Sequence, residues 1–489
     1  MIDTPTVDWL ALAPALALLG AAGLCLVGAV LVPRLARRPF SAVVCAAGFV
    51  TAGVLAGVAF ERSPEAESLI ADSMVRDRFA FYAQLVICGA GVLATLFSWG
   101  DGRRSHVGEY YSLVAVAGAG RLFFVQAESL LTLFLGLEWF SIALYILCAL
   151  DTHRERSLEA GLKYLIVGSF GSSILLFGAA LVYGATGELG FTAIREAPGA
   201  DDPMFVVGLA MIIAGLGFKA SAAPFHMWTP DVYQGAPTAV TGFMSAATKT
   251  AALVATLRIL VTAFPEQDEI WEIAVAVLAI ASLAVGNLAA LVQSDVKRLL
   301  AYSSVSQAGF LLIAVATNTA EAGSALLYFL VPYGAASLGA FAVVAIRERE
   351  LGRDVTLDDL AGFGWERPLY GVAMWAFVLS FAGLPFTGGF LGKFYVFAAA
   401  YEAGWWWIVL IAVVATAVSL YYYLGIVKAM YMRPGPAPGP AVAVAGGSPP
   451  RDAALGLGVA GALAVVVGSF FFVQPLVDLA TEASASLPW

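Results

Sequence analysis

Long apolar segments separated by short polar connections recur along the whole chain. A helix that crosses about 30 Å of hydrocarbon at about 1.5 Å per residue needs about 20 apolar residues. Fourteen segments reach that length, and two of them, 204–232 and 369–401, are interrupted. The uninterrupted ones are 10–32, 40–60, 79–99, 108–127, 129–150, 161–184, 237–263, 271–293, 298–317, 323–346, 405–432 and 453–475. The pattern predicts an all-α polytopic membrane protein with about 14 transmembrane helices.

The two interrupted segments, helices 7 and 12 in chain order, share a local pattern. Each contains a lysine within two turns of a helix-breaking residue, in the runs GLGFKASAAPFHMW and SFAGLPFTGGFLGKFYVF. The predicted breaks are at Pro224 in helix 7 and at Pro385, Gly388 and Gly389 in helix 12. They lie five helices apart, so helices 4–8 and 9–13 are expected to be two repeats, inverted because five is odd. Broken helices at matching places in inverted halves indicate a transport site.

This reading divides the chain into four parts. Residues 1–107 form helices 1–3, 108–263 the first repeat, 264–432 the second repeat, and 433–489 a loop and helix 14. The acidic residues Asp3 and Asp8 stand where a cleavable signal would be basic, so no such signal is expected.

Composition excludes several classes of protein. Hydrophobic residues make up 60% of the chain and charged residues 12%, against about 25% charged in soluble domains. The net charge is −9 and no basic patch occurs, which argues against a nucleic-acid binder. The four cysteines stand in apolar runs without a CxxC motif, and we expect them to be small buried side chains. Three scattered histidines and the lack of a phosphate-binding loop predict no metal or redox cofactor in this chain.

Loop charges predict the orientation in the membrane. The odd-numbered connections hold 16 basic residues, whereas the even-numbered connections and nearby helix ends hold six. By the positive-inside rule the odd connections are cytoplasmic, so both termini are expected on the outer side.

The remaining four basic residues are all lysines, and they lie inside predicted helices. They are Lys163, Lys219, Lys249 and Lys393, in a chain with six lysines and twenty arginines. Buried lysine can release its proton, whereas arginine cannot. A charged side chain at the bilayer centre costs roughly 2.5–3.5 kcal/mol, so these lysines and the acidic Glu138 of helix 5 must pair, reach water or become neutral. They are candidates for a proton relay; structural ion pairs between helices are the alternative.

Structural roles are open to three of the polar residues, Lys163, Arg121 and His226. Lys163 lies two or three residues inside helix 6 and is able to snorkel to the cytoplasmic face. Arg121 in helix 4 is expected to reach outward as an anchor, toward Glu128. His226, just past the first break, is either a relay or a hydrogen-bonded structural residue.

Helix 10 is polar on one side. Its run LLAYSSVSQAGF carries the candidates Ser303, Ser304, Ser306 and Gln307. These side chains either line a hydrated path or bond back to their own helix backbone, as hydroxyls in membrane helices do. Asp295, Lys297 and Arg298 before them are expected to be a charge cluster at the membrane boundary.

Three runs resemble a known family. FHMWTPDVYQGAPTAVTGFMSAATKTAA, KRLLAYSSVSQAGF and SFAGLPFTGGFLGKFYVF are similar to the antiporter-like membrane subunits of respiratory complex I. The resemblance spans roughly residues 108–430, and the TPDVYQGAPT segment is most similar to the N type of bacterial NADH-quinone oxidoreductase.

The resemblance implies roles for the buried charges. Glu138 matches the acidic partner of the lysine at position 219, Lys249 the central connecting lysine and Lys393 the terminal lysine at the exit path. Lys163 matches a lysine common on helix 6 of the family. Where many members carry histidine this chain has Gln307, which holds no proton near neutral pH, so any relay there must run through water or hydroxyls.

The implied function is proton translocation by a non-redox subunit, coupled to quinone reduction elsewhere in the complex. NADH, flavin, iron–sulfur clusters and quinone are expected in other subunits. The expected partners are an antiporter-like neighbour, small membrane subunits and the lipid bilayer of a bacterial cell membrane, and no nucleic acid. Three alternatives stay open: an Mrp-type sodium/proton antiporter subunit, a permease with a substrate-sized pocket at the breaks, and a structural spacer.

Overall fold

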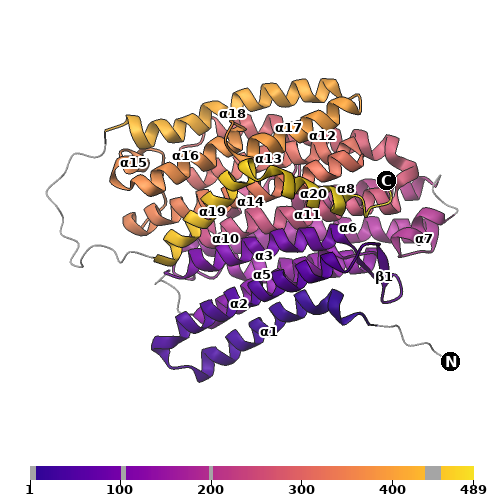
Figure 1. The fold of residues 1–489 in the computed structure, drawn as a ribbon, viewed down its shortest axis with the longest axis horizontal. Coiled ribbons are helices and arrows are strands. Elements are labelled where there is room, and N and C mark those ends of the chain that lie inside the picture. Colours follow the sequence, from indigo (N-terminus) through magenta and orange to yellow (C-terminus); the bar gives the residue numbers. More distant parts are fainter. Residues whose placement is uncertain (1–6, 101–105, 198–201, 435–452) are drawn as a thin grey trace.

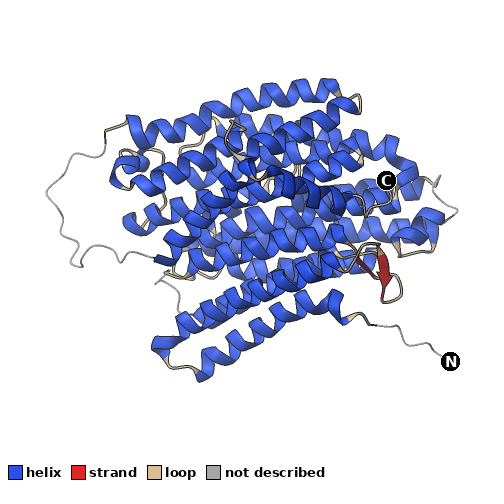
Figure 2. Cartoon of the chain, in the orientation of Figure 1, coloured by secondary structure: helices blue, strands red, loops and turns tan. Residues whose placement is uncertain are grey.

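Helices run in one common direction through most of the computed structural model, which describes residues 7–100, 106–197, 202–434 and 453–489 (Figures 1 and 2). In the first half they are α1 (Trp9–Leu31), α2 (Arg34–Glu61), α3 (Arg78–Ser98), α4 (Val107–Val125), α5 (Leu130–Cys148), α6 (Glu155–Thr186), α7 (Phe191–Glu196), α8 (Pro203–Ala220), α9 (Trp228–Gly235), α10 (Thr238–Phe243), the π-helical η1 (Met244–Thr248) and α11 (Lys249–Ala263).

The second half of the chain, from residue 265 to the C-terminus, is also mostly helical. It contains the 3-10 turn η2 (Pro265–Gln267), α12 (Asp268–Ala290), α13 (Val296–Thr317), α14 (Ala320–Leu351), the 3-10 turn η3 (Asp358–Leu360), α15 (Phe363–Glu366), α16 (Pro368–Ala382), α17 (Gly388–Glu402), α18 (Trp406–Met432), α19 (Ala453–Phe471) and α20 (Val473–Ser484).

Twelve helices in the described residues are long and apolar enough to cross a membrane, so the chain is a multi-pass helical membrane protein as predicted. The twelve include α10, η1 and α11 as one continuous span, Thr238–Ala263. Two of the fourteen predicted spans are not among them: α4, and the broken pair α16–α17, whose halves have 15 residues each. The count of fourteen, the inverted repeats and the four-part division stay predictions.

Several elements were not predicted from sequence. An antiparallel hairpin, β1 (Glu67–Leu69) and β2 (Met74–Arg76), connects α2 to α3. The short α7 follows α6, and the chain after α19 bends at Phe472 into α20. These pieces are too short or too polar to produce a spanning signal, which is why hydropathy alone did not reveal them.

Both predicted breaks are present, and each begins at a residue with positive φ. α8 ends at Ala220 and has Ser221 (φ 63°) as its C-cap, and α9 starts at Trp228; α16 ends at Ala382 and has Gly383 (φ 72°) as its C-cap, and α17 starts at Gly388. At the second break the backbone passes very close to itself: a Cβ on Gly389 would overlap the carbonyl oxygen of Ser380. Only glycine fits there.

The core of the bundle is formed by the span from α10 to α11 together with α13 and α14, which are buried along almost their whole length. The peripheral spans α1, α2, α18 and α19 bury only about a third of theirs. The helices that carry Lys249 and the polar face 303–307 are therefore shielded from lipid by other helices.

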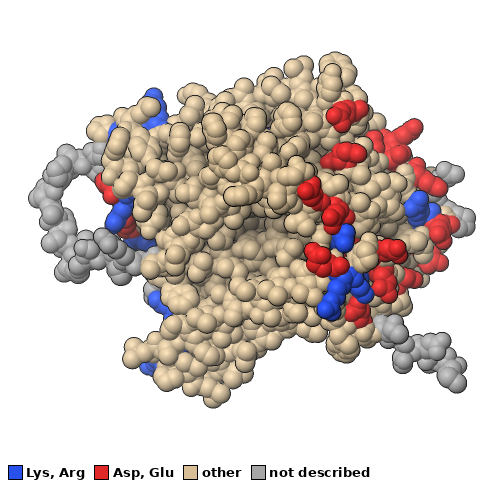
Figure 3. Space-filling view, in the orientation of Figure 1, with Lys and Arg blue, Asp and Glu red and all other residues tan. Residues whose placement is uncertain are grey.

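Charges gather at the two ends of the bundle. Acidic side chains crowd the end where α7 and the C-terminus lie, while the opposite end shows mainly basic ones (Figure 3). The start of α1 lies at the acidic end too (Figure 1). This agrees with the predicted separation of loop charge; which end faces the cytoplasm stays a prediction, and Arg103, Arg104 and Arg451, which contributed to it, lie outside the described residues.

Candidate functional site

Lys219 occupies the last turn of α8, directly before the first break. Its Nζ donates hydrogen bonds to Ser141 Oγ (2.6 Å) on α5 and to Tyr164 OH (3.3 Å) on α6. The ammonium also faces the ring of Phe140, 4.8 Å from its centroid. Hydroxyls and aromatic rings, rather than a carboxylate, hold this cation.

Glu138 lies one turn before Ser141 on α5, in the same site. Its Oε1 is buried without a hydrogen-bond partner. Lys219 and Glu138 are near enough to interact electrostatically, but no ion pair joins them in the part of the chain that the structure describes. The predicted partners therefore share a site without touching.

Lys249 follows the π-helical turn η1, in the middle of a continuous span. Its Nζ donates to the backbone oxygen of Ser304 on α13 and lies 5.8 Å from the ring centroid of Tyr333 on α14. Isolated π-helical turns inside α-helices are frequent at functional sites, and here the widened turn ends one residue before the lysine.

The polar face of α13 lies between Lys249 and Lys393. Ser304 Oγ bonds to Tyr333 OH (3.0 Å), Ser303 Oγ bonds to Tyr423 OH (2.5 Å), and Gln307 Nε2 donates to that same Tyr423 hydroxyl (3.2 Å). These side chains bond to other helices and not back to their own backbone. Ser306 likewise bonds to another helix, since it donates to Asn287 Oδ1 (3.0 Å) on α12.

Lys393 lies on α17, just after the second break. Its Nζ donates to the carbonyl oxygen of Phe381 (2.7 Å), in the last turn of α16, and sits 3.8 Å from the ring centroid of Phe310. Gln307 Nε2 donates to the same carbonyl (2.9 Å). Lys393 and Gln307 thus meet at a backbone oxygen that the helix break leaves available.

Lys219, Lys249 and Lys393 are 2, 2 and 3% exposed, and none of them contacts a carboxylate within the described residues. The observation weighs against the alternative of structural ion pairs for these three. Lys163 is different: it is 43% exposed at its side chain and forms ion pairs with Glu159 (2.7 Å) and Asp231 (2.9 Å).

Asp231 on α9 also pairs with Arg298 Nη1 (2.7 Å), so Lys163 and Arg298 share one acid at the end where the basic loops lie. The predicted boundary cluster is only partly right. Asp295 caps α13 by accepting from the backbone N–H of Arg298 (2.9 Å), but Lys297 is 1% exposed and donates to the carbonyl of Ala236 (2.7 Å). Lys297 is thus a fourth deeply buried lysine, which the loop-charge pattern did not single out. The use of lysine rather than arginine at this position was a signal that could have identified it.

The expectation that Arg121 reaches outward to Glu128 is wrong. Arg121 is fully buried in α4 and donates to Thr248 Oγ1 (2.8 and 3.3 Å) and to the carbonyl of Ala117 (3.1 Å). Glu128 instead lies 3.9 Å from Arg258, which forms a buried bidentate pair with Asp77 (2.7 and 2.9 Å). Helical spacing does not reveal that the guanidinium turns into the bundle.

His226 lies in the connection after the first break, and its Nδ1 is buried without a hydrogen-bond partner. Its ring centroid is 6.4 Å from that of Tyr302 on α13. It therefore lies near the polar helix, apart from the contacts of Lys219. The four cysteines are free and buried, as predicted, and the described residues include no group of acidic, histidine or cysteine side chains arranged to hold a metal ion.

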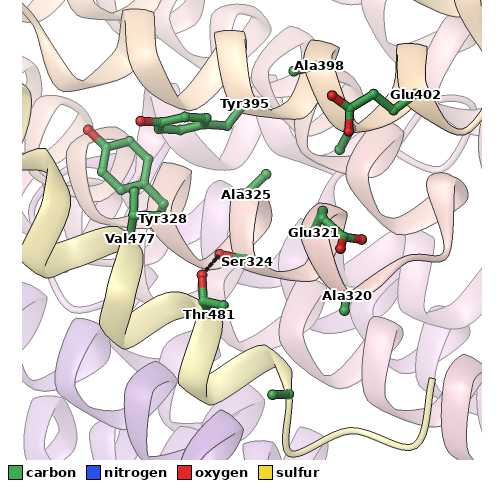
Figure 4. A pocket seen from close by; sticks show the side chains of 12 residues that line it. Ala320, Glu321, Ser324, Ala325, Tyr328, Tyr395, Ala398, Glu402, Val477 and Thr481 are labelled. Carbon is green, nitrogen blue, oxygen red and sulfur yellow. Dashed lines mark hydrogen bonds between the residues drawn. The ribbon is translucent and has the colours of Figure 1, made fainter.

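A cavity of about 320 Å³ opens between α14, α17 and α20 (Figure 4). Glu321 and Glu402 lie on one side of it, and Tyr328 and Tyr395 on the other (Figure 4). Its lining includes none of the buried lysines and neither helix-breaking proline. This cavity is not the substrate pocket at the breaks that an organic permease would need.

The chain is similar to a known family and to named proteins. Residues 127–419 match the family described as NADH:quinone oxidoreductase/Mrp antiporter, transmembrane. The subunit N 2 of NADH-quinone oxidoreductase from Roseiflexus castenholzii is 38% identical over 98% of this chain and 97% of its own length. Subunit N from Trichlorobacter lovleyi is 40% identical over 75% of this chain and 77% of its own.

Solved structures of related chains have a similar fold. A chain of respiratory complex I from Thermus thermophilus with bound aureothin is 34% identical, with a TM-score of 0.78 over 96% of this chain and 99% of that one. A chain of the Mrp complex from Dietzia sp. superposes with a TM-score of 0.86 over 98% and 97%, but at 24% identity that likeness concerns the fold alone.

Proposed function

The chain belongs to the NADH:quinone oxidoreductase/Mrp antiporter transmembrane family, and we propose that it is a proton-translocating membrane subunit of the N type in an NADH-quinone oxidoreductase. The observation that supports the translocating role is the set of three deeply buried lysines, Lys219, Lys249 and Lys393, which contact no carboxylate in the part of the chain that the structure describes. A buried ammonium held only by hydroxyls, carbonyls and rings is poised to exist in either protonation state.

Proton loading takes place at Lys219. When Glu138 approaches, the opposite charge strengthens the hold of Lys219 on its proton, and when the two separate that hold weakens. Each change of about 1.36 kcal/mol in the interaction shifts the protonation equilibrium tenfold. The separation seen here, with Lys219 bonded to Ser141 and Tyr164, represents the releasing arrangement.

The released proton moves through Lys249 toward Lys393. Between these two lysines stand the hydroxyls of Ser303, Ser304, Tyr333 and Tyr423, which donate and accept in turn. Gln307 bridges Tyr423 to the Phe381 carbonyl that Lys393 also contacts, and it orients this network without itself carrying a proton. Ser306 lies outside the chain of bonds and is a structural member of the helix face.

Protons enter from the end of the bundle with the basic loops and leave at the acidic end. Lys163, with Asp231 and Arg298, forms a polar patch at the uptake side that connects α6, α9 and α13. His226, with a free Nδ1, lies on the way inward and accepts a proton there. Uptake is cytoplasmic and both termini are outside, in a bacterial cell membrane.

This chain performs no redox step. NADH, flavin, iron–sulfur clusters and quinone act in other subunits, and conformational coupling arrives through a neighbouring antiporter-like subunit and small membrane subunits. An Mrp-type antiporter subunit has the same fold, but the relatives that share about 40% of their residues are named as oxidoreductase subunits.

The test is Lys219→Ala in the assembled complex in proteoliposomes, with proton uptake and NADH oxidation measured together. We expect proton pumping to be lost. Lys428→Ala, an exposed lysine near the end of α18, is the matched control and should pump normally. Normal pumping by the Lys219 variant would favour the structural-spacer alternative and refute the proposal; sodium-dependent proton flux without NADH would point to the antiporter instead.

A further inference from the structure

Arg121 is a buried cation that the mechanism above does not use. Its side chain is 0% exposed, its guanidinium lies 4.2 Å from the ring centroid of Phe243 and 5.4 Å from that of Phe140, and Thr248 Oγ1 accepts two of its N–H bonds. No ion pair to Arg121 occurs among residues 7–100, 106–197, 202–434 and 453–489. Because arginine keeps its proton in proteins, this is a permanent charge without a carboxylate.

The backbone is built to admit this side chain. A Cβ on Gly120 would lie 2.8 Å from the backbone nitrogen of Phe140, so α4 and α5 approach each other closely just before Arg121. Cation–π contacts and the threonine hydroxyl then replace the hydration that the guanidinium loses. A purely structural contact between two apolar helices would not need a charge here, since a neutral side chain fills the same space without desolvation.

Arg121 contacts residues that adjoin two of the proposed relay lysines, Lys219 and Lys249. The ring of Phe140 faces both Arg121 and Lys219, the latter at 4.8 Å. Thr248, which holds the guanidinium, is the last residue of the π-helical turn and directly precedes Lys249. One guanidinium therefore connects the two lysine environments through an aromatic ring on one side and a hydroxyl on the other.

We propose that Arg121 is a positioning residue for proton translocation: it fixes the π-helical turn that presents Lys249 and sets a permanent positive charge beside Lys219. The charge opposes protonation of Lys219, so the proton leaves this lysine more readily toward Lys249. This inference rests on the proposed function.

Other titratable groups face the same space and must be considered. On α5, α6 and α9 they are Glu138, Tyr145, Cys148, Tyr164 and Tyr233. Glu138 is the only carboxylic acid among these five groups, since the others are tyrosine hydroxyls and a thiol. Removal of Arg121 therefore leaves Lys219 with Glu138 as the dominant charged neighbour.

The first experiment compares Arg121→Gln with Arg121→Lys in the assembled complex in proteoliposomes. The glutamine retains donors for Thr248 but no charge, so we expect pumping near neutral pH to fall several-fold and its pH optimum to move upward by about one unit. The lysine restores the charge and should recover most of the pumping. A variant whose fold is merely damaged would pump less at every pH, and its pH optimum would not move.

The second experiment keeps the arginine and removes its acceptor. Thr248→Val should lower pumping, and Thr248→Ser, which retains the hydroxyl, should recover more of it. Thr250→Val is the matched control, because the Thr250 hydroxyl only bonds back to the Ala246 carbonyl (2.9 Å) of its own helix. This pair of variants decides the matter if Arg121→Gln does not assemble.

Three outcomes would overturn the inference: wild-type pumping and pH optimum in Arg121→Gln, an Arg121→Lys variant as defective as Arg121→Gln, or a Thr248→Val variant indistinguishable from Thr250→Val. These outcomes leave the proposed function intact as long as Lys219→Ala abolishes pumping. Normal pumping by Lys219→Ala would instead remove the proposed function itself.

Discussion

The two helix breaks place their lysines in different surroundings. At the first, Lys219 precedes the break and donates to side-chain hydroxyls of two other helices, while the nearby carbonyl of Phe218 accepts from Trp228 Nε1 (3.0 Å). At the second, Lys393 follows the break and donates to a backbone oxygen, the carbonyl of Phe381 in the last turn of α16.

The difference concerns what can move. The partners of Lys219 are side-chain hydroxyls, whose torsions have alternative staggered positions, so they can be exchanged without movement of the backbone. The partner of Lys393 is a backbone oxygen in a break that close-packed glycines fix. A lysine whose partners exchange suits a loading step, whereas one with a fixed acceptor suits a terminal position. Similar sequence signals thus produce sites of different mobility.

The largest expected effect is that of replacing Glu138, the acidic residue near Lys219 at the first break. Glu138→Gln keeps the shape of the side chain but removes its charge, so Lys219 can no longer be switched by it. We expect proton pumping in proteoliposomes to fall at least about tenfold, since an opposite charge nearby typically shifts a protonation equilibrium by that much. The surface substitution Glu155→Gln, at the start of α6, is the control. Retained pumping would mean that the first break does not depend on a mobile acid.

An intermediate effect is expected from a substitution that introduces a steric overlap at the second break. A Cβ on Gly389 would overlap the Ser380 carbonyl, so Gly389→Ala should destabilise the subunit by about 1–3 kcal/mol and lower the yield of assembled complex. Gly425→Ala on α18, where a Cβ meets nothing within 4 Å, should leave thermal stability unchanged or slightly improved. Equal melting temperatures for the two variants would show that the second break is not tightly packed.

The smallest effect is expected at Gln307. Gln307→Leu removes one donor to the Phe381 carbonyl but leaves Lys393 bonded to it, so pumping should fall less than about twofold. The measurement is the ratio of protons pumped to NADH oxidised. A loss as large as that of Glu138→Gln would instead place Gln307 at a step that every proton must pass, and the contrast between the two breaks would disappear.

Much of the fold follows from the sequence alone. The length of each apolar run locates the spans because the bilayer excludes unpaired backbone groups. Pro224 and Pro385 locate the breaks because proline lacks a backbone donor, and Gly388–Gly389 because glycine disfavours a helix interior. The lysines at positions 219, 249 and 393 stood out because charge is costly at that depth. Each of these inferences needs only the residue and its neighbours along one helix.

Which residues meet was decided by the packing of helices distant in sequence. Arg121 turns to Thr248, Lys297 is buried under Ala236, and Glu138 stands apart from Lys219. The side-chain pattern of a helix gives the face on which a residue lies but not which helix covers that face. Partners therefore depend on close packing among several helices at once, and that information exists only in the folded bundle.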